Sequence, residues 1–155
     1  YAPISKNFIL YTRGEAGYGG GFIKTNQLPF YSNFYAGGMQ SVRGYEGNSL
    51  GPRDSNGDPY GGNIIIDGSI SLIFPNFISP DNLRTSLFVD GGQVYEDEGV
   101  TTDTGVALEN LRYSVGLDVQ WLSPIGMLEF SLAKALNPSS DDTTQFFDFY
   151  IGAYF

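Results

Sequence analysis

Apolar and polar residues alternate along much of this chain. The clearest example runs from Arg112 to Trp121. Its apolar residues occupy every second position: Tyr113, Val115, Leu117, Val119 and Trp121. The positions between them hold Arg112, Ser114, Gly116, Asp118 and Gln120. Because successive side chains of a β-strand point to opposite faces, the segment predicts a strand with one apolar and one polar face.

Five further segments show the same period of two: residues 7–18, 63–74, 84–95, 127–136 and 145–155. Each is about 10 to 12 residues long, which is the length of a tilted strand that crosses a membrane. The mean strand of a soluble sheet is shorter. No apolar set at helical spacing lasts for three turns, so the chain is predicted to be all-β.

The predicted links between these strands alternate in length. Residues 19–62 and 96–111 form long links, 75–83 and 122–126 form short ones, and 137–144 form an intermediate one. Long loops on one side and tight turns on the other are typical of an antiparallel transmembrane β-barrel, whose apolar face points outward to lipid. A soluble ligand-binding barrel, whose apolar face points inward, is the alternative.

The composition excludes several classes of function. The chain has 155 residues, 8 Lys and Arg against 17 Asp and Glu, and a formal net charge of -9, which argues against nucleic acid as a partner. It contains no histidine and no cysteine. Disulfides, imidazole or thiolate metal sites and imidazole-based catalysis are therefore excluded, and neither a cofactor nor an enzyme is expected.

Three polar features of the predicted loops have simple explanations. Residues 47–51 match the G-x-S-x-G hydrolase motif, but no strand precedes them and no histidine exists to act as base. Residues 54–58 resemble the start of a calcium loop, yet Pro59 and Ile65 replace its glycine and glutamate, so a turn is expected. Loop acids are expected to be solvated, with cation-bridged contact to anionic lipid as the alternative: Asp97, Glu98, Asp103, Glu109, Asp141 and Asp142.

The segment 28–51 is rich in aromatic residues although it lies inside the longest link. A long link is usually functional or disordered, and this composition is not that of a disordered segment. We therefore expect the segment to fold back into the barrel lumen. Arg43 would then be partly buried and would need an acidic partner, for which Asp90 is the first candidate. The alternative is a surface loop with Arg43 in water.

Several motifs, in order, resemble the BamA family of bacterial β-barrel assembly proteins, and they cover nearly the whole chain. In and near the long link they are Leu28-Pro29-Phe30-Tyr31, Asn33 to Gly38, Val42-Arg43-Gly44-Tyr45 and Gly61-Gly62-Asn63. Further along they are Arg84-Thr85-Ser86, Phe88 to Gly92, Gln120 to Pro124 and Phe147 to Phe155. The resemblance implies a sixteen-stranded outer-membrane barrel preceded by periplasmic POTRA domains.

The match covers only the last six strands and the long loop of such a barrel. Residues 1–155 are thus expected to be the C-terminal part of the barrel domain, excised from a longer chain, with the loop 19–62 in the lumen and the POTRA domains absent. Such a fragment would have about six to eight strands. Three solutions for the closure of such a fragment stay open: extra strands near residues 1–6 or 30–36, self-association, or an open sheet.

The resemblance also assigns roles to particular residues. It places the loop motif Val42, Arg43, Gly44 and Tyr45 inside the barrel, docked on Phe88 and Asp90. Some relatives add a second acid, where this chain has Ser71, although Asp67 lies on the same face. The last strand would form a lateral seam and the β-signal, through Phe147, Phe149, Ile151, Gly152 and Phe155.

The implied function is to assist the folding and insertion of β-barrel proteins into the outer membrane, through that seam and by β-augmentation. The implied partners are nascent outer-membrane proteins, outer-membrane lipid and, in the full-length protein, the Bam lipoproteins. A passive small barrel or pore without insertase activity is the alternative.

Overall fold

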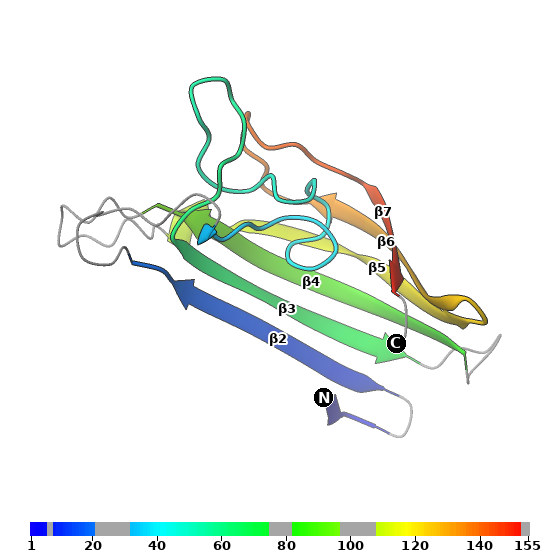
Figure 1. Cartoon of the computed structure of the whole chain (residues 1–155). Helices are drawn as coiled ribbons and strands as arrows, with labels where there is room; N and C mark the ends of the chain where they lie inside the picture. Colours follow the sequence, from blue (N-terminus) through cyan, green and yellow to red (C-terminus); the bar gives the residue numbers. More distant parts are fainter. Residues whose placement is uncertain (6–7, 21–31, 75–81, 97–107, 153–155) are drawn as a thin grey trace.

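The computed structural model describes residues 1–5, 8–20, 32–74, 82–96 and 108–152. They form one antiparallel sheet in which neighbours in the chain are neighbours in space (Figure 1). Its strands are β1 (Ala2–Pro3), β2 (Ile9–Tyr18), β3 (Ile64–Phe74), β4 (Leu83–Tyr95), β5 (Arg112–Ser123), β6 (Gly126–Ala135) and β7 (Phe147–Gly152). The 3-10 turn η2 covers Leu108–Asn110. No helix in these ranges is long and apolar enough to cross a membrane.

The predicted all-β fold class is confirmed, and all six predicted segments contain a strand. The seventh strand, β1, lies within residues 1–6, where an extra strand was considered. The other region considered, 30–36, adds no strand to the sheet in its described part. There Phe34 and Ala36 form isolated bridges to Gly62 and Leu50, which belong to the same link. Within the described ranges, β1 and β7 are the two edges of the sheet.

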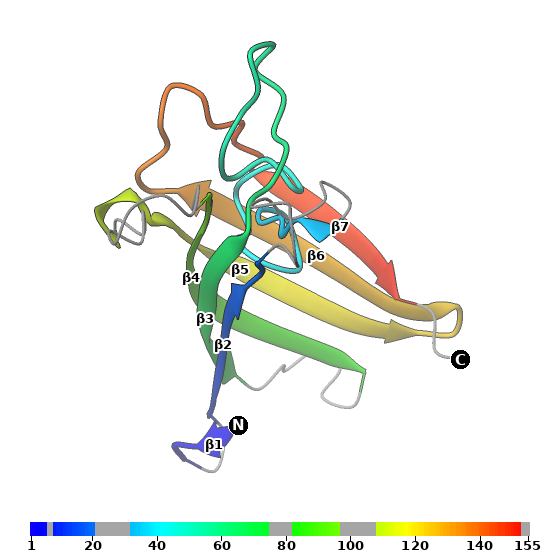
Figure 2. The same ribbon diagram turned by 60° about the vertical axis from the view of Figure 1, so that its left-hand side comes forward.

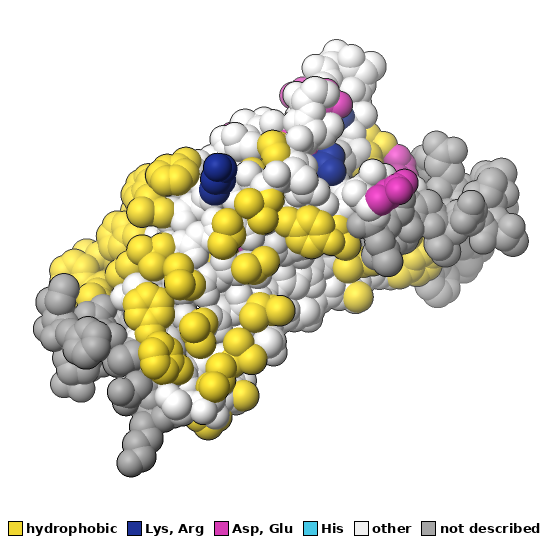
Figure 3. Space-filling model, turned by 180° about the vertical axis from the view of Figure 1, so that it is seen from behind, with side chains coloured by type: hydrophobic (Ala, Val, Ile, Leu, Met, Phe, Trp, Pro, Cys, Tyr) yellow, Lys and Arg dark blue, Asp and Glu magenta, His cyan; other side chains and the backbone are white. Residues whose placement is uncertain are grey.

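The two faces of the sheet have opposite character. Polar side chains of the inner face are buried, among them Ser69, Ser86, Ser114 and Asp118. The apolar side chains between them are exposed on the other face, for example Ile70, Leu87, Val89, Tyr113, Val115 and Trp121. Figure 3 shows this outer face, over which apolar side chains are spread with few charges. The arrangement is that of a membrane barrel and the reverse of a soluble ligand-binding barrel.

The long link between β2 and β3 covers the polar face. Residues 32–63 lie on the concave side of the curved sheet (Figures 1 and 2). They contribute most of a small apolar core, made of Ala36, Val42, Tyr45, Leu50, Ile65 and Val94. In the described ranges, the buried apolar side chains lie level with Phe88 or nearer to the loop end of the strands. The loop therefore supplies the core that the polar inner face of the strands lacks.

We predict that a charge on the outer face is far more costly than one on the inner face. Val89 lies in the middle of β4 and is 48% exposed on the apolar face. Val89→Arg should lower the free energy of unfolding in lipid by about 2–4 kcal/mol, because a cation cannot be solvated at the bilayer midplane. The measurement is urea-induced unfolding in vesicles.

Gln120→Arg is the matched control, because Gln120 lies on the polar face of β5 and donates to Glu129 at 3.3 Å. Equal destabilisation by the two substitutions would contradict the assignment of the outer face to lipid.

Candidate functional site

The tip of the long link is a closed loop that presents Arg43 to the sheet. Its two sides meet where the N–H of Leu50 donates to the carbonyl of Ala36 at 3.0 Å. Within it, the N–H of Gly38 donates to the carbonyls of Val42 and Tyr45 at 3.1 and 3.0 Å. Gly38 has a φ of +83°, a conformation that residues with a side chain rarely adopt. The glycine therefore permits the turn that aims Arg43 at the strands.

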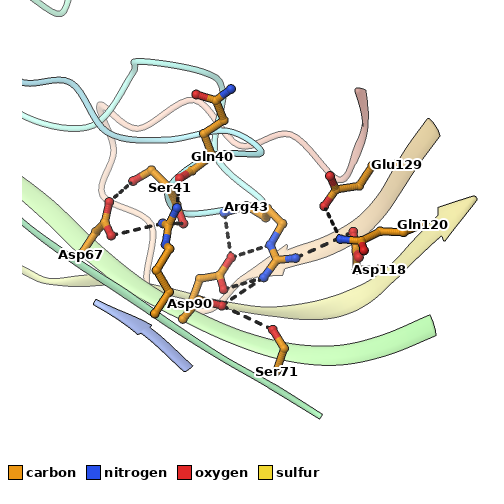
Figure 4. A network of polar contacts seen from close by, with 11 residues as sticks. Gln40, Ser41, Arg43, Asp67, Ser71, Asp90, Asp118, Gln120 and Glu129 are labelled. Carbon is orange, nitrogen blue, oxygen red and sulfur yellow. Dashed lines mark hydrogen bonds and ion pairs between the residues drawn. The ribbon is translucent and has the colours of Figure 1, made fainter. Parts of the chain in front are cut away.

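Arg43 and Asp90 form a bidentate ion pair on the polar face of β4 (Figure 4). The Nε atom of Arg43 donates to Oδ2 of Asp90 at 2.7 Å, and Nη2 donates to Oδ1 at 2.8 Å. The main-chain N–H of Arg43 donates to the same carboxylate at 3.1 Å. Arg43 is 9% exposed and Asp90 is fully buried. Arg43 is thus buried and paired with Asp90, as expected. It does not lie in water on a surface loop, which was the alternative.

Three further groups surround the guanidinium of Arg43. Its Cζ atom lies 3.4 Å from the centre of the Phe88 ring, a cation–π arrangement. Nη2 also donates to the hydroxyl of Ser69 at 3.2 Å. Nη1 lies 3.8 Å from Oδ1 of Asp118 on β5. A buried cation is costly unless its donors are satisfied, and this shell satisfies them on several sides.

The second carboxylate near Arg43 is Asp118, which the sequence analysis placed on the polar face of its strand but did not assign to the site. Ser71 supplies no charge there, and Asp67 serves a different arginine. The sheet register explains the contact, because Asp118 pairs with Ser86 two residues before Phe88. A count along a single strand could not have found a residue that comes from the neighbouring one.

A second arginine holds the loop from the opposite direction. Arg13 of β2 donates to the main-chain carbonyls of Gln40 and Ser41, and it pairs with Asp67 of β3 at 3.1 Å. The hydroxyl of Ser41 donates to the other oxygen of Asp67 at 3.0 Å. Arg43 thus reaches from the loop to the sheet, while Arg13 reaches from the sheet to the loop. The spacing of residues along the chain does not reveal this second anchor.

The other residues of the loop motif pack around the ion pair. Val42 and Tyr45 are fully buried, and the hydroxyl of Tyr45 donates to the carbonyl of Tyr113 at 3.3 Å. Burial and, secondly, the nearby Asp142 carboxylate raise the pKa of the Tyr45 hydroxyl, so it stays a neutral donor. Gly44 has a φ of +90°, and a Cβ there would lie 3.2 Å from that of Ala133.

The predicted seam residues lie apart from this site. Phe147, Phe149 and Ile151 project from β7 onto the exposed apolar face, and the ring of Phe149 stacks 6.5 Å from that of Phe130. Gly152 ends β7, and a Cβ there would lie 3.3 Å from the ring of Tyr150. Phe155 lies outside the described residues. The structure thus brings the loop motif together with Phe88 and Asp90 and leaves the seam residues as a separate group.

The expectation that the loop acids are solvated holds for some of them and is wrong for Asp142. Asp142 is not solvated, because its side chain is only 7% exposed and pairs with Arg112. Asp141 and Glu109 are exposed, as expected of solvated loop charges. Asp97, Glu98 and Asp103 lie outside the described residues.

The two loop motifs form turns. The hydroxyl of Ser49 is buried and donates to the carbonyl of Glu46 at 2.7 Å. The carboxylate of Asp54 accepts from the N–H groups of Asp58 and Asn56, which lower the pKa of Asp54. Among the described residues, no group of three or more acids could hold a metal ion.

Comparisons with known proteins agree on one family. The sequence profile described as the Omp85 superfamily domain matches residues 1–155. The outer membrane protein assembly factor BamA of Neisseria meningitidis serogroup B is 39% identical over 180 residues, which cover 100% of this chain and 23% of the relative. BamA of Nitratidesulfovibrio vulgaris is 30% identical over 161 residues, which cover 100% of this chain and 19% of the relative.

A solved structure gives the same result. The crystal structure of BamA from Haemophilus ducreyi lacking POTRA domains 1–3 aligns with a TM-score of 0.84 and 34% identity. The alignment covers 97% of this chain and 32% of that chain. The chain thus spans less than a quarter of the length of the two curated relatives described above.

We predict that Arg43→Ala releases the loop. Removal of one partner of a buried ion pair leaves the other charge uncompensated, so the free energy of unfolding should fall by about 3–5 kcal/mol. Limited proteolysis should then cut within residues 32–51, and urea-induced unfolding gives the energy. Arg84→Ala is the control, because Arg84 is an exposed arginine of β4. Unchanged protease resistance of the Arg43 variant would refute the anchoring role.

A second prediction concerns the Phe88 ring, which packs between Arg43 and Gly116. A Cβ at Gly116 would lie 2.5 Å from the Phe88 ring and 2.2 Å from the carbonyl of Leu132. Gly116→Ala should therefore displace the ring from the guanidinium and increase proteolysis of the loop. Gly14→Ala is the matched control, because the nearest atom to its Cβ would be 3.9 Å away. The same protease sensitivity in both variants would mean that the close approach at Gly116 is unimportant.

Proposed function

The chain belongs to the Omp85 superfamily, and from this membership we propose that it is part of an assembly factor that folds and inserts β-barrel proteins into the outer membrane. The predicted likeness to BamA is confirmed by the comparisons, and the family is one of outer-membrane proteins of Gram-negative bacteria. The activity itself, with its mechanism and partners, is our inference, since the chain spans a small part of its relatives.

The observation that carries the mechanism is the edge of the sheet at β7. In the described part of the chain, β7 pairs with β6 alone. The N–H of Ala133 donates to the carbonyl of Phe146 at 2.9 Å. Since hydrogen bonding alternates along an antiparallel ladder, Asp148 and Tyr150 also face β6, whereas the main-chain groups of Phe149 and Ile151 face away from it. The N–H of Phe149 donates to Oδ1 of Asp148 at 2.8 Å, so the outward groups that an added strand would use are the carbonyl of Phe149 and the N–H and carbonyl of Ile151.

We infer that an incoming strand pairs with this edge by β-augmentation. An unsatisfied N–H or C=O group costs several kcal/mol in lipid, so an edge that satisfies those groups lowers the barrier to insertion. The side chains of Phe149 and Ile151 are exposed on the apolar face, where an added strand would continue the lipid-facing surface. A short apolar belt beside this edge would also thin the bilayer through hydrophobic mismatch.

The Arg43 loop has a structural role in this proposal. It fills the concave face with a small core and two arginine anchors, so we propose that it occupies the lumen of the complete barrel and braces its wall. No covalent bond of a client protein is made or broken in such a mechanism. The partners would be unfolded outer-membrane proteins, the lipid around the seam and the accessory lipoproteins of the family's assembly complex.

The test is the rate at which a urea-unfolded outer-membrane protein folds into liposomes that carry the natural full-length protein. Ile151→Pro should reduce the acceleration about tenfold or more, since it removes one edge donor in the strand that templates insertion. Proline is tolerated at an edge position whose N–H does not bond to the neighbouring strand, so the β6–β7 ladder should survive.

Ile151→Ala is the control, because it shortens the same side chain but keeps the N–H group. Equal rates for the two variants would count against templating by the β7 edge. A full-length protein that gives no acceleration over empty liposomes would overturn the proposed function and favour a passive barrel or pore.

A further inference from the structure

The loop that carries Arg43 also forms main-chain hydrogen bonds with the link that leads into β7. Tyr45 and Thr144 form an antiparallel bridge. On one side of it the N–H of Glu46 donates to the carbonyl of Thr143 at 2.9 Å, and on the other the N–H of Gln145 donates to the carbonyl of Gly44 at 3.0 Å. Residues 44–46 and 143–145 thus form a short two-stranded segment, which we name the splice.

The splice lies close to both the Arg43–Asp90 ion pair and the start of β7. At its loop end, Gly44 directly follows Arg43, whose side chain is fixed to Asp90. At the same end, Gln145 donates to the carbonyl of Gly44 and precedes Phe146, whose carbonyl accepts the first hydrogen bond from β6. The path from the buried ion pair to the start of the β6–β7 ladder is therefore short, with one main-chain hydrogen bond between Gln145 and Gly44.

An ion pair holds the link in place for this contact. The carboxylate of Asp142 accepts from Nε of Arg112 at the start of β5 and from the N–H of Ser139 at 2.7 Å. The side chains of Arg112 and Asp142 are 16% and 7% exposed. Arg112 also donates to the carbonyl of Asn110 at 3.0 Å, which fixes its own position. Asp142 directly precedes the splice, so this ion pair ties the link to the first residue of β5.

We propose that the splice couples the Arg43 loop to β7 and that Asp142 is the positioning residue that keeps the splice formed. Displacement of the loop breaks the bonds of Glu46 and Gln145 and frees the loop-side end of β7. Displacement of β7 loosens the loop through the same bonds, because coupling between two sites is reciprocal. The consequence for assembly rests on the proposed function, since β7 is the strand that would template a client.

The experiment measures amide hydrogen exchange, residue by residue, in the natural full-length protein in liposomes. Asp142→Asn keeps the shape of the side chain and removes its charge. The exchange of the Glu46 and Gln145 amides should rise about tenfold or more, as expected when a charge-assisted hydrogen bond is lost. Asp141→Asn is the matched control, because Asp141 is exposed and accepts only from Ser140, at 3.2 Å, among the contacts described. It should leave both amides unchanged.

The reciprocal perturbation is made from the loop. Arg43→Ala should raise the exchange of Gln145, Asp148 and Tyr150, although none of them contacts the Arg43 side chain. The charge swap Arg112→Asp with Asp142→Arg should restore protection at Glu46 relative to Arg112→Asp alone. A purely local structural role of Asp142 would predict neither the effect at a distance nor the rescue.

The coupling is overturned if Asp142→Asn affects only residues 139–142, or if the effect of Arg43→Ala stops before Gln145. Assembly measured on the same vesicles separates this proposal from the proposed function. Faster exchange with unchanged assembly would support the coupling and count against β7 as the template. Unchanged exchange of the Glu46 and Gln145 amides would refute the proposed coupling, whatever the assembly rate.

Discussion

The burial of one positive charge organises this protein. Arg43 is almost fully buried against the polar face of the sheet, where a lone guanidinium would be too costly. It therefore requires Asp90 in bidentate geometry, the ring of Phe88 beneath it, and a glycine at position 116 to leave room for that ring. The path of the loop, the register of β4 with β5 and the position of the core all satisfy this single requirement.

The strands could be predicted from the sequence because their signal is local. A period of two is visible within ten residues, and the same parity places Asp90 with Phe88 on the polar face, which makes Asp90 a candidate partner for Arg43. The partners of Asp118, Arg13 and Asp142 could not be predicted in the same way. Each contact joins segments whose relative position depends on sheet register or on the path of a loop, and neither is encoded in spacing along one strand.

The distribution of polarity explains why the longest link is so well ordered in its described part. A sheet with an apolar outer face gains its stability from lipid on that side and has few apolar groups to offer inside. Val42, Tyr45 and Leu50 supply the missing interior, and two arginines fix them in place. The link therefore serves as the core of the sheet that it interrupts.

The buried apolar side chains of the described residues lie level with Phe88 or nearer to the loop end, so the sheet is stiff at one end only. A sheet clamped in this way bends as a cantilever does, with the largest displacement at the free end and almost none at the clamp. The turn between β5 and β6 can therefore follow a change in the curvature of the surrounding wall while the geometry around Arg43 stays constant. The interior brace therefore constrains the wall least toward the turns.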